Sequence, residues 1–136
     1  MKNHEEQLVI QFGDADPAGV VFYPRLITMA HEVVENLIRH SAIGWNTWFA
    51  SPTYAVPIRR SEADFFRPMA AGQRFTARAK VEKVGVTSVT FAVEFTSDQS
   101  EVTARVRTVH VFIDKSTGNP MTLPDAIRCV LGEAAS

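Results

Sequence analysis

The strongest constraint on the fold is that the sequence has only one long helical pattern, followed mostly by strand patterns. In residues 25–39, apolar side chains recur at the spacing of a helix that buries one face. Pro24 stands just before them and suits the first turn of a helix, where its missing N–H is no loss. We therefore predict one long helix that begins near Pro24.

Alternation of apolar and polar residues predicts strands in most of the remaining chain. The predicted strands are residues 7–12, 53–66, 74–84, 87–96 and 101–113. Pro57 favours an edge position or a bulge for the second of them, because proline donates no hydrogen bond to a sheet. A short aromatic segment at residues 44–51 and a short helix at residues 123–131 complete the prediction.

These elements predict an α+β fold in which the helix packs on one face of a five-stranded antiparallel sheet. No internal repeat or interdomain linker interrupts the pattern, so residues 1–136 are expected to form a single domain. One helix covers only part of a five-stranded sheet. The uncovered edge and face favour pairing with further copies of the chain, as a homodimer or homotetramer.

Charge and composition exclude several functional classes. The formal net charge of the 136 residues is −1, which gives no general basic field for nucleic acid. The longest apolar run, residues 18–23, is far shorter than the roughly 20 residues of a membrane span, and the charged start lacks a secretory signal pattern. The single cysteine, Cys129, excludes an intramolecular disulfide and a multi-cysteine zinc site, and we expect it to be buried. A cytoplasmic protein is predicted.

A turn rich in Gly, Asp and Pro lies directly before the helix, at residues 13–19. A carboxylate there, such as Asp16, can attack a carbonyl group or activate water. The helix that follows presents unpaired N–H groups, and the N–H of Tyr23 is the candidate donor to an oxyanion. The alternative interpretation is that Asp14 and Asp16 are only turn and capping residues, as aspartate often is.

The segment from Phe12 to Pro24, FGDADPAGVVFYP, closely resembles the active-site segment of the 4-hydroxybenzoyl-CoA thioesterase family. That family follows the pattern D-x-D-x-x-G-[IV]-V-x-[YFH] into its central helix. Pro57-Ile58, residues 63–68 and Gly72 resemble its second strand and the turn after it. His31-Glu32 and residues 104–111 are similar to its 1,4-dihydroxy-2-naphthoyl-CoA branch. The resemblance spans most of residues 7–113.

The resemblance implies a hotdog fold, in which an antiparallel sheet wraps a long helix and two subunits share sites at their interface. It also implies hydrolysis of an acyl-CoA thioester, with coenzyme A as part of the substrate and no separate cofactor. Asp16 matches the family's catalytic aspartate, as nucleophile or general base, and Tyr23 matches its helix-start position. Asp14 keeps the structural interpretation. Phe22 and Tyr23 stand where some members carry His or Asn, which leaves the acyl group open.

Coenzyme A carries phosphates, so basic residues are expected at the mouth of such a site. The candidates are Arg59, Arg60, Arg67, Lys83, Arg105 and Arg107. Period-2 spacing places the last two on one face of a strand. The alternative is that each belongs to the solvated face of an amphipathic strand. Glu62, a weaker candidate for a second polar group in the site, is expected to pair with Arg60.

His31 and Glu35 are four residues apart on the predicted helix, in a pattern close to the zinc-binding H-E-x-x-H motif. Because Glu35 replaces the second histidine, an ion pair is favoured over a metal, and no metal site is predicted. His31 remains a candidate for the border of the acyl pocket. The aromatic residues after the helix are expected in the core or at a subunit contact, or as the walls of a flat pocket for an aromatic acyl group. They are Trp45, Trp48, Phe49 and Tyr54.

The function predicted from the sequence is therefore hydrolysis of an aromatic acyl-CoA, of the hydroxybenzoyl or dihydroxynaphthoyl type. One alternative is a thioesterase for short or medium acyl chains on coenzyme A or acyl carrier protein. Another is a hotdog protein that binds acyl-CoA without catalysis, since a fold alone does not fix function. The carboxylate in the turn argues against the second alternative, because a binding protein has no need of it beside the thioester.

Overall fold

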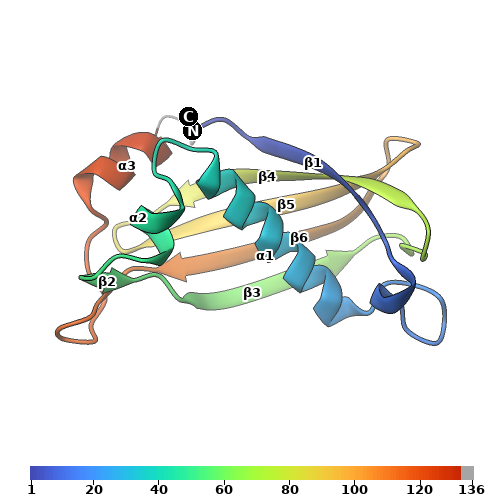
Figure 1. Cartoon of the computed structure of the whole chain (residues 1–136), viewed down its shortest axis with the longest axis horizontal. Helices are drawn as coiled ribbons and strands as arrows, with labels where there is room; N and C mark the ends of the chain where they lie inside the picture. Colours follow the sequence, from blue (N-terminus) through green and yellow to red (C-terminus); the bar gives the residue numbers. More distant parts are fainter. Residues whose placement is uncertain (133–136) are drawn as a thin grey trace.

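The computed structural model describes residues 1–132, which form a twisted sheet with helices on one face (Figure 1). In chain order the elements are β1 (His4–Val9), a 3₁₀ turn (Phe12–Asp14), α1 (Tyr23–Arg39), α2 (Trp45–Phe49), β2 (Tyr54–Ala55), β3 (Ile58–Phe65), β4 (Arg74–Val84), β5 (Ser88–Ser97), β6 (Val102–Val111), β7 (Ile113–Asp114) and α3 (Asp125–Gly132). The five-stranded sheet has the order β1-β4-β5-β6-β3, and all its neighbours are antiparallel. The predicted α+β class is confirmed.

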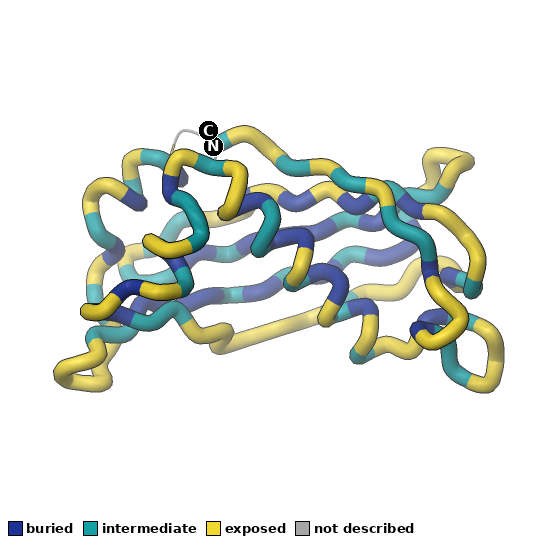
Figure 2. The backbone as a smooth tube through the Cα atoms, in the orientation of Figure 1, coloured by how far each residue is buried: buried dark blue, intermediate teal, exposed yellow. Residues whose placement is uncertain are grey.

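α1 lies across the sheet and buries a single apolar stripe against it (Figure 2). On the sheet side, Ala77 and Ala79 of β4 are fully buried and leave room for the helix to approach closely. Larger side chains from β4 and β5, including Phe75, Phe91 and Phe95, fill the rest of the core. In this packing the N-terminal end of α1 lies near the end of β3, next to the turn at residues 13–22 (Figure 1).

The first strand exists, but its predicted bounds, residues 7–12, are wrong. β1 begins at His4 and ends at Val9, and Phe12 lies in the 3₁₀ turn with 93% of its surface exposed. The polar start of the chain was not predicted as strand because it lacks alternation. It pairs with β4 as an edge strand, where side chains such as Glu5 face solvent and contact Arg78.

Two other predicted strands are each divided in the structure. Residues 53–66 separate at Val56-Pro57 into β2 and β3, and residues 101–113 separate into β6 and β7. β2 pairs with β7 in a small separate sheet. Pro57 has the predicted effect, because β3 is an edge strand and its register shifts between Ile58 and Arg60.

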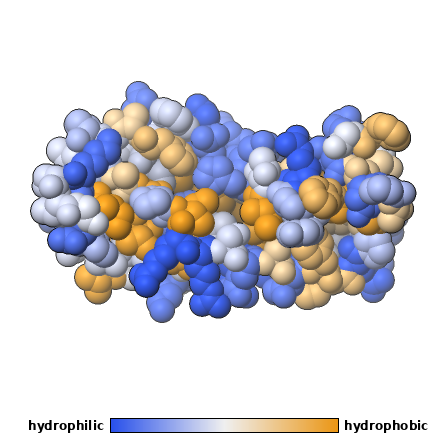
Figure 3. Space-filling view, turned by 90° about the horizontal axis from the view of Figure 1, so that it is seen from below, coloured by the Kyte–Doolittle hydropathy of each residue, from blue (hydrophilic) through white to orange (hydrophobic). Residues whose placement is uncertain are grey.

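β3 leaves an unusually open edge. Seven of its eight residues are exposed, and Ala63 is half-buried. Its exposed apolar side chains include Ile58 and Phe65, and the adjacent Phe66 is exposed as well. Seen from the β3 side, apolar patches alternate with hydrophilic residues along the molecule (Figure 3). A long edge of this kind is a template for pairing with another strand.

α3 packs on the sheet through Ile127 and Leu131, while Cys129 is exposed. The expectation that Cys129 is buried was therefore wrong, because it lies on the outer face of the helix. Within residues 1–132, no helix is long and apolar enough to cross a membrane. Residues 133–136 of the predicted domain lie outside the described residues.

Candidate active site

The turn before α1 is closed by backbone hydrogen bonds and holds Asp16 near its tip. The N–H of Asp16 donates to the carbonyl of Val20 at 2.9 Å, and the N–H of Gly19 donates to the carbonyl of Asp16 at 2.9 Å. Gly19 has a φ of 83°, a conformation that residues with a Cβ rarely adopt. The glycine is thus a requirement of the turn itself.

The same turn is fixed to the segment that follows β3. The N–H of Val21 donates to the carbonyl of Met69 at 2.8 Å, and the N–H of Ala71 donates to the carbonyl of Gly19 at 3.1 Å. These bonds join regions about fifty residues apart in sequence. They explain why the predicted turn residues around Gly72 belong to the same site as Asp16.

Asp16 is half-buried, and its two carboxylate oxygens differ in their contacts. Oδ1 accepts a hydrogen bond from the N–H of Ala18 at 2.9 Å. Among residues 1–132, no donor contacts the second oxygen, Oδ2. This geometry fixes the side chain through one oxygen and leaves the other available to a ligand or to water.

The N-terminal end of α1 presents the backbone amide of Tyr23 next to this turn. Tyr23 is the first helical residue, Phe22 provides no side-chain cap, and Pro24 has no N–H. The N–H of Phe22 donates to the carbonyl of Asp14 at 2.8 Å. Within the described part of the chain, the N–H of Tyr23 has no acceptor, and the positive end of the helix dipole adds to its preference for an anion.

A mainly apolar groove of about 370 Å³ begins beside this turn. It is lined by Val20, Val21, Phe65, Phe66, Arg67, Pro68 and Met69. A larger, polar cavity of about 580 Å³ lies next to it and shares Arg67 and Pro68 with the groove. Arg67 forms an ion pair with Glu101 at this junction. Of the predicted basic residues, Arg67 is thus the one that lines the groove beside Asp16.

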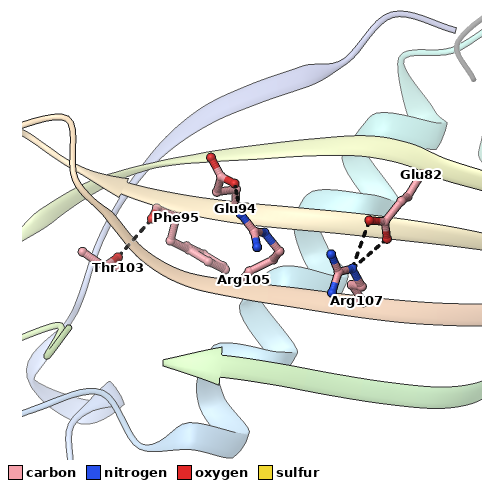
Figure 4. A network of polar contacts seen from close by, with 6 residues as sticks. All are labelled: Glu82, Glu94, Phe95, Thr103, Arg105 and Arg107. Atoms are coloured by element: carbon pink, nitrogen blue, oxygen red, sulfur yellow. Dashed lines mark hydrogen bonds and ion pairs between the residues drawn. The ribbon is translucent and has the colours of Figure 1, made fainter. Parts of the chain in front are cut away.

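The other predicted basic residues lie elsewhere. Arg105 pairs with Glu94 at 2.9 Å and Arg107 pairs with Glu82 at 2.8 Å, on the face of the sheet away from α1 (Figure 4). Their predicted common face is thus confirmed, and both guanidinium groups are already engaged.

Arg59 and Arg60 lie on the exposed edge strand, and Arg60 pairs with Glu62 at 3.7 Å, as expected. Lys83 is exposed near the end of β4. A role in binding coenzyme A stays a prediction for all five of these basic residues, Arg59, Arg60, Lys83, Arg105 and Arg107.

The predicted pair between His31 and Glu35 is not formed. Glu35 instead accepts a hydrogen bond from the indole of Trp45 at 3.1 Å and lies 4.0 Å from Arg39. Nδ1 of His31 is buried without a hydrogen-bond partner among the described residues, and its ring stacks on that of His110 at 6.3 Å. In the described part of the chain, no group of three or more His, Cys, Asp or Glu side chains is placed to hold a metal ion.

His110 is a buried titratable residue that was not singled out from the sequence. It lies in β6 with 1% of its surface exposed, and its Nε2 contacts the hydroxyl of Thr108 at 2.9 Å. Burial, together with the charge of His31, lowers the pKa of His110 to about 4. The available signal was that position 110 shares the inward face of the strand with Ala104 and Val106.

The aromatic segment has two roles. Trp48 and Tyr54 are buried, and their rings lie 5.2 Å and 5.3 Å from that of Phe112. This confirms the core interpretation for both. Trp45 and Phe49 are only half-buried, and Phe49 meets the ring of His31 edge-on at 6.3 Å. An aromatic pocket formed by these residues stays a prediction.

Comparison with known proteins identifies similar sequences and folds. Residues 10–131 match the family model described as the thioesterase-like superfamily. A 1,4-dihydroxy-2-naphthoyl-CoA hydrolase from Nostoc punctiforme is 34% identical over 118 residues, which cover 87% of this chain and 79% of that protein. The corresponding hydrolase from Rippkaea orientalis is 30% identical over 120 residues, or 87% of each.

A solved structure of a 1,4-dihydroxy-2-naphthoyl-CoA thioesterase from Synechocystis has the same fold. Its TM-score to this chain is 0.87, with 99% of each chain covered and 20% sequence identity. At that identity the likeness concerns the fold alone. It confirms the predicted hotdog arrangement, in which the antiparallel sheet wraps around α1.

Proposed function

The chain belongs to the thioesterase-like superfamily, and from this premise we propose that it hydrolyses an aromatic acyl-CoA to the free acid and coenzyme A. The observation that carries the proposal is that one hydrogen-bonded turn holds Asp16 and leads directly into Tyr23. Among residues 1–132, no donor contacts Oδ2 of Asp16 and no acceptor contacts the N–H of Tyr23. Water is the other reactant, and coenzyme A belongs to the substrate, so no separate cofactor takes part.

In the proposed reaction, the carbonyl oxygen of the thioester accepts a hydrogen bond from the N–H of Tyr23. Negative charge that develops on this oxygen is stabilised by the helix N-terminus, and losing such a donor typically costs about 2.7–4 kcal/mol of barrier stabilisation. Asp16 then acts in one of two ways. It attacks the carbonyl carbon, releases the thiolate and forms an anhydride that water cleaves, or it accepts a proton from water that attacks directly.

The apolar groove beside the turn supports an aromatic acyl group or the apolar part of the pantetheine arm as its occupant. Phe65 and Phe66 line it, and aromatic side chains pack well against flat rings. Arg67, at the junction with the polar cavity, is our candidate for a coenzyme A phosphate. The names of the similar hydrolases support the dihydroxynaphthoyl type of substrate.

We place the protein in the cytoplasm, since a single cysteine suits a reducing compartment.

The decisive measurement is the release of free thiol from a panel of aryl- and alkyl-CoA thioesters. We expect kcat/KM for hydroxyaryl-CoA substrates to exceed that for medium-chain acyl-CoA by at least about tenfold, a difference of about 1.4 kcal/mol in transition-state binding. Faster turnover of alkyl thioesters would support the short- or medium-chain alternative. Binding of acyl-CoA without thiol release would support the non-catalytic one.

We further propose that the chain forms a homodimer through β3. The basic residues Arg59 and Arg60 lie in the first half of the strand, and its acidic residues, Glu62 and Asp64, lie in the second half. In an antiparallel pair, the basic half of one copy therefore lies beside the acidic half of the other. Ile58 and Phe65 stand at opposite ends of the strand, so the same pairing brings apolar side chains together.

Phe65→Lys is expected to convert the dimer into a monomer at micromolar concentration, because it places a charge at the end of the paired edge. Light scattering after size-exclusion chromatography measures the mass. Val86→Lys is the matched control, since Val86 is also an exposed apolar residue but lies in the β4–β5 turn. A monomeric wild-type protein, or equal dissociation of both variants, would contradict pairing through β3.

A further inference from the structure

Asp14 links three parts of the chain around the candidate catalytic turn. Its Oδ1 accepts a hydrogen bond from Nε of Arg25 at 2.7 Å, and its Oδ2 accepts one from the N–H of Gln11 at 2.8 Å. Its backbone carbonyl accepts a hydrogen bond from the N–H of Phe22 at 2.8 Å. Asp14, the last residue of the 3₁₀ turn, therefore contacts the residue before that turn, the residue before α1 and the first turn of α1.

The pair of Asp14 and Arg25 encloses the residues assigned to catalysis. Asp16 lies two residues after Asp14, and Tyr23 lies two residues before Arg25. An ion pair between the outer residues therefore spans the loop that separates the inner ones. The position of the Asp16 carboxylate relative to the Tyr23 amide depends on how this loop closes.

The carboxylate of Asp14 is buried, whereas the side chain of its partner Arg25 is about half exposed. Asp14 is 5% exposed, and burial alone would raise its pKa. This effect is outweighed by the hydrogen bonds from Arg25 and Gln11 and by the charge of Arg25, so the pKa of Asp14 is lowered. Asp14 therefore stays ionised, and Arg25 neutralises it. An uncompensated carboxylate here would oppose the negative charge that develops on the substrate oxygen.

A purely local role in capping α1 explains these contacts incompletely. The capping residue, Phe22, offers no side-chain acceptor, and the first turn of α1 contains no acidic residue. Asp14 comes from outside the helix and binds the side chain of Arg25, which needs no cap. The contact therefore fixes α1 relative to the turn, which is more than the capping of the helix end.

We propose that Asp14 and Arg25 form a positioning pair, which sets the orientation of the Asp16 carboxylate and the Tyr23 amide toward the thioester. This inference rests on the proposed function. Neither residue of the pair touches the substrate. Misplacement of a catalytic group by about 1 Å can cost about 10²-fold in rate, so loss of the pair acts on turnover more than on binding.

The kinetic test compares Arg25→Gln, Arg25→Lys and Asp14→Asn with the wild-type enzyme. Arg25→Gln is expected to lower kcat by about 10–100-fold with KM changed by less than about twofold, and Arg25→Lys to recover part of kcat. Arg78→Gln is the matched control, because it also removes an arginine paired with a carboxylate, here Glu5, on β4 far along the sequence. A wild-type kcat in Arg25→Gln and Asp14→Asn, or an equal loss in Arg78→Gln, would overturn the proposal.

A second measurement needs no turnover. Amide hydrogen exchange at Ala18 and Phe22, which donate to Asp16 and Asp14, is expected to accelerate at least about tenfold in Arg25→Gln, with the strands unchanged. If the wild-type protein hydrolyses no thioester but exchange accelerates, the proposed function fails and the positioning role stands. If exchange is unchanged in Arg25→Gln, the positioning role fails. Should Arg25→Gln not fold, Arg25→Lys gives the same comparison with a smaller expected change.

Discussion

Asp16→Asn is expected to lower kcat for thioester hydrolysis by about 10²–10⁴-fold, the usual contribution of a positioned acid–base group. An amide neither attacks the carbonyl carbon effectively nor accepts a proton from water. The turn itself should persist, because the side-chain oxygen of asparagine can still accept the N–H of Ala18. Substrate binding is therefore expected to remain close to that of the wild-type protein, as measured by calorimetry with a non-hydrolysable thioether analogue.

The control is Asp125→Asn, the same chemical change at the start of α3. It should leave kcat unchanged. If Asp16→Asn kept most of the wild-type activity, Asp16 would not be the catalytic carboxylate, and Glu62 or Glu35 would be tested next. Labelling of Asp16 after a single turnover in ¹⁸O-labelled water would establish the anhydride route. Labelled oxygen enters the Asp16 carboxylate only if an anhydride forms there and water attacks the aspartyl carbonyl.

Acidification from pH 7 to pH 4 is expected to reduce the free energy of unfolding by about 3 kcal/mol through His110 alone. The pKa of His110 is lowered from 6.5 to about 4, first by burial and then by the charge of His31. Between these two values the unfolded chain binds a proton that the folded chain does not. The contribution of neutral His110 to the free energy of unfolding is therefore fully present above pH 6.5, the pKa in the unfolded chain, and is lost as the pH falls toward 4.

Urea unfolding at a series of pH values between 7 and 4 measures this effect. His110→Gln removes the titrating group and should flatten the pH dependence, whatever its effect on stability at pH 7. His40→Gln is the matched control, because His40 is exposed at the end of α1 and should leave the slope unchanged. Equal slopes in wild type and His110→Gln would show that His110 is not the group responsible.

The predictions that held depend on neighbours in sequence. The long helix and the strand at residues 74–84 were predicted almost to the residue, because each carries an unbroken period that buries one face. Asp16 and Tyr23 were selected together because the first lies in the turn before α1 and the second is the first residue of that helix; their catalytic roles stay predictions. The strand at residues 7–12 was wrong because β1 is polar at its start and gains its hydrogen bonds from β4, a strand about seventy residues later.

Errors in the site arose where the partner of a side chain comes from another element. The spacing of His31 and Glu35 suggested a pair, but the indole N–H of Trp45 in α2 donates a hydrogen bond to Glu35 instead. Arg25 was not singled out, since nothing in a helix pattern identifies a contact with Asp14 across a loop. Arg105 and Arg107 share a face as expected, yet the sequence did not identify the glutamates opposite them on β4 and β5.

The sequence by itself determined the helix, the alternating strands and the turn that carries Asp16, because these follow from backbone preferences and periods over a few residues. Only the tertiary structure decided that β3 is an open edge, that His110 is buried and which charges pair. Those properties depend on strand order and register, which the whole core fixes at once. A residue's local sequence does not contain that information.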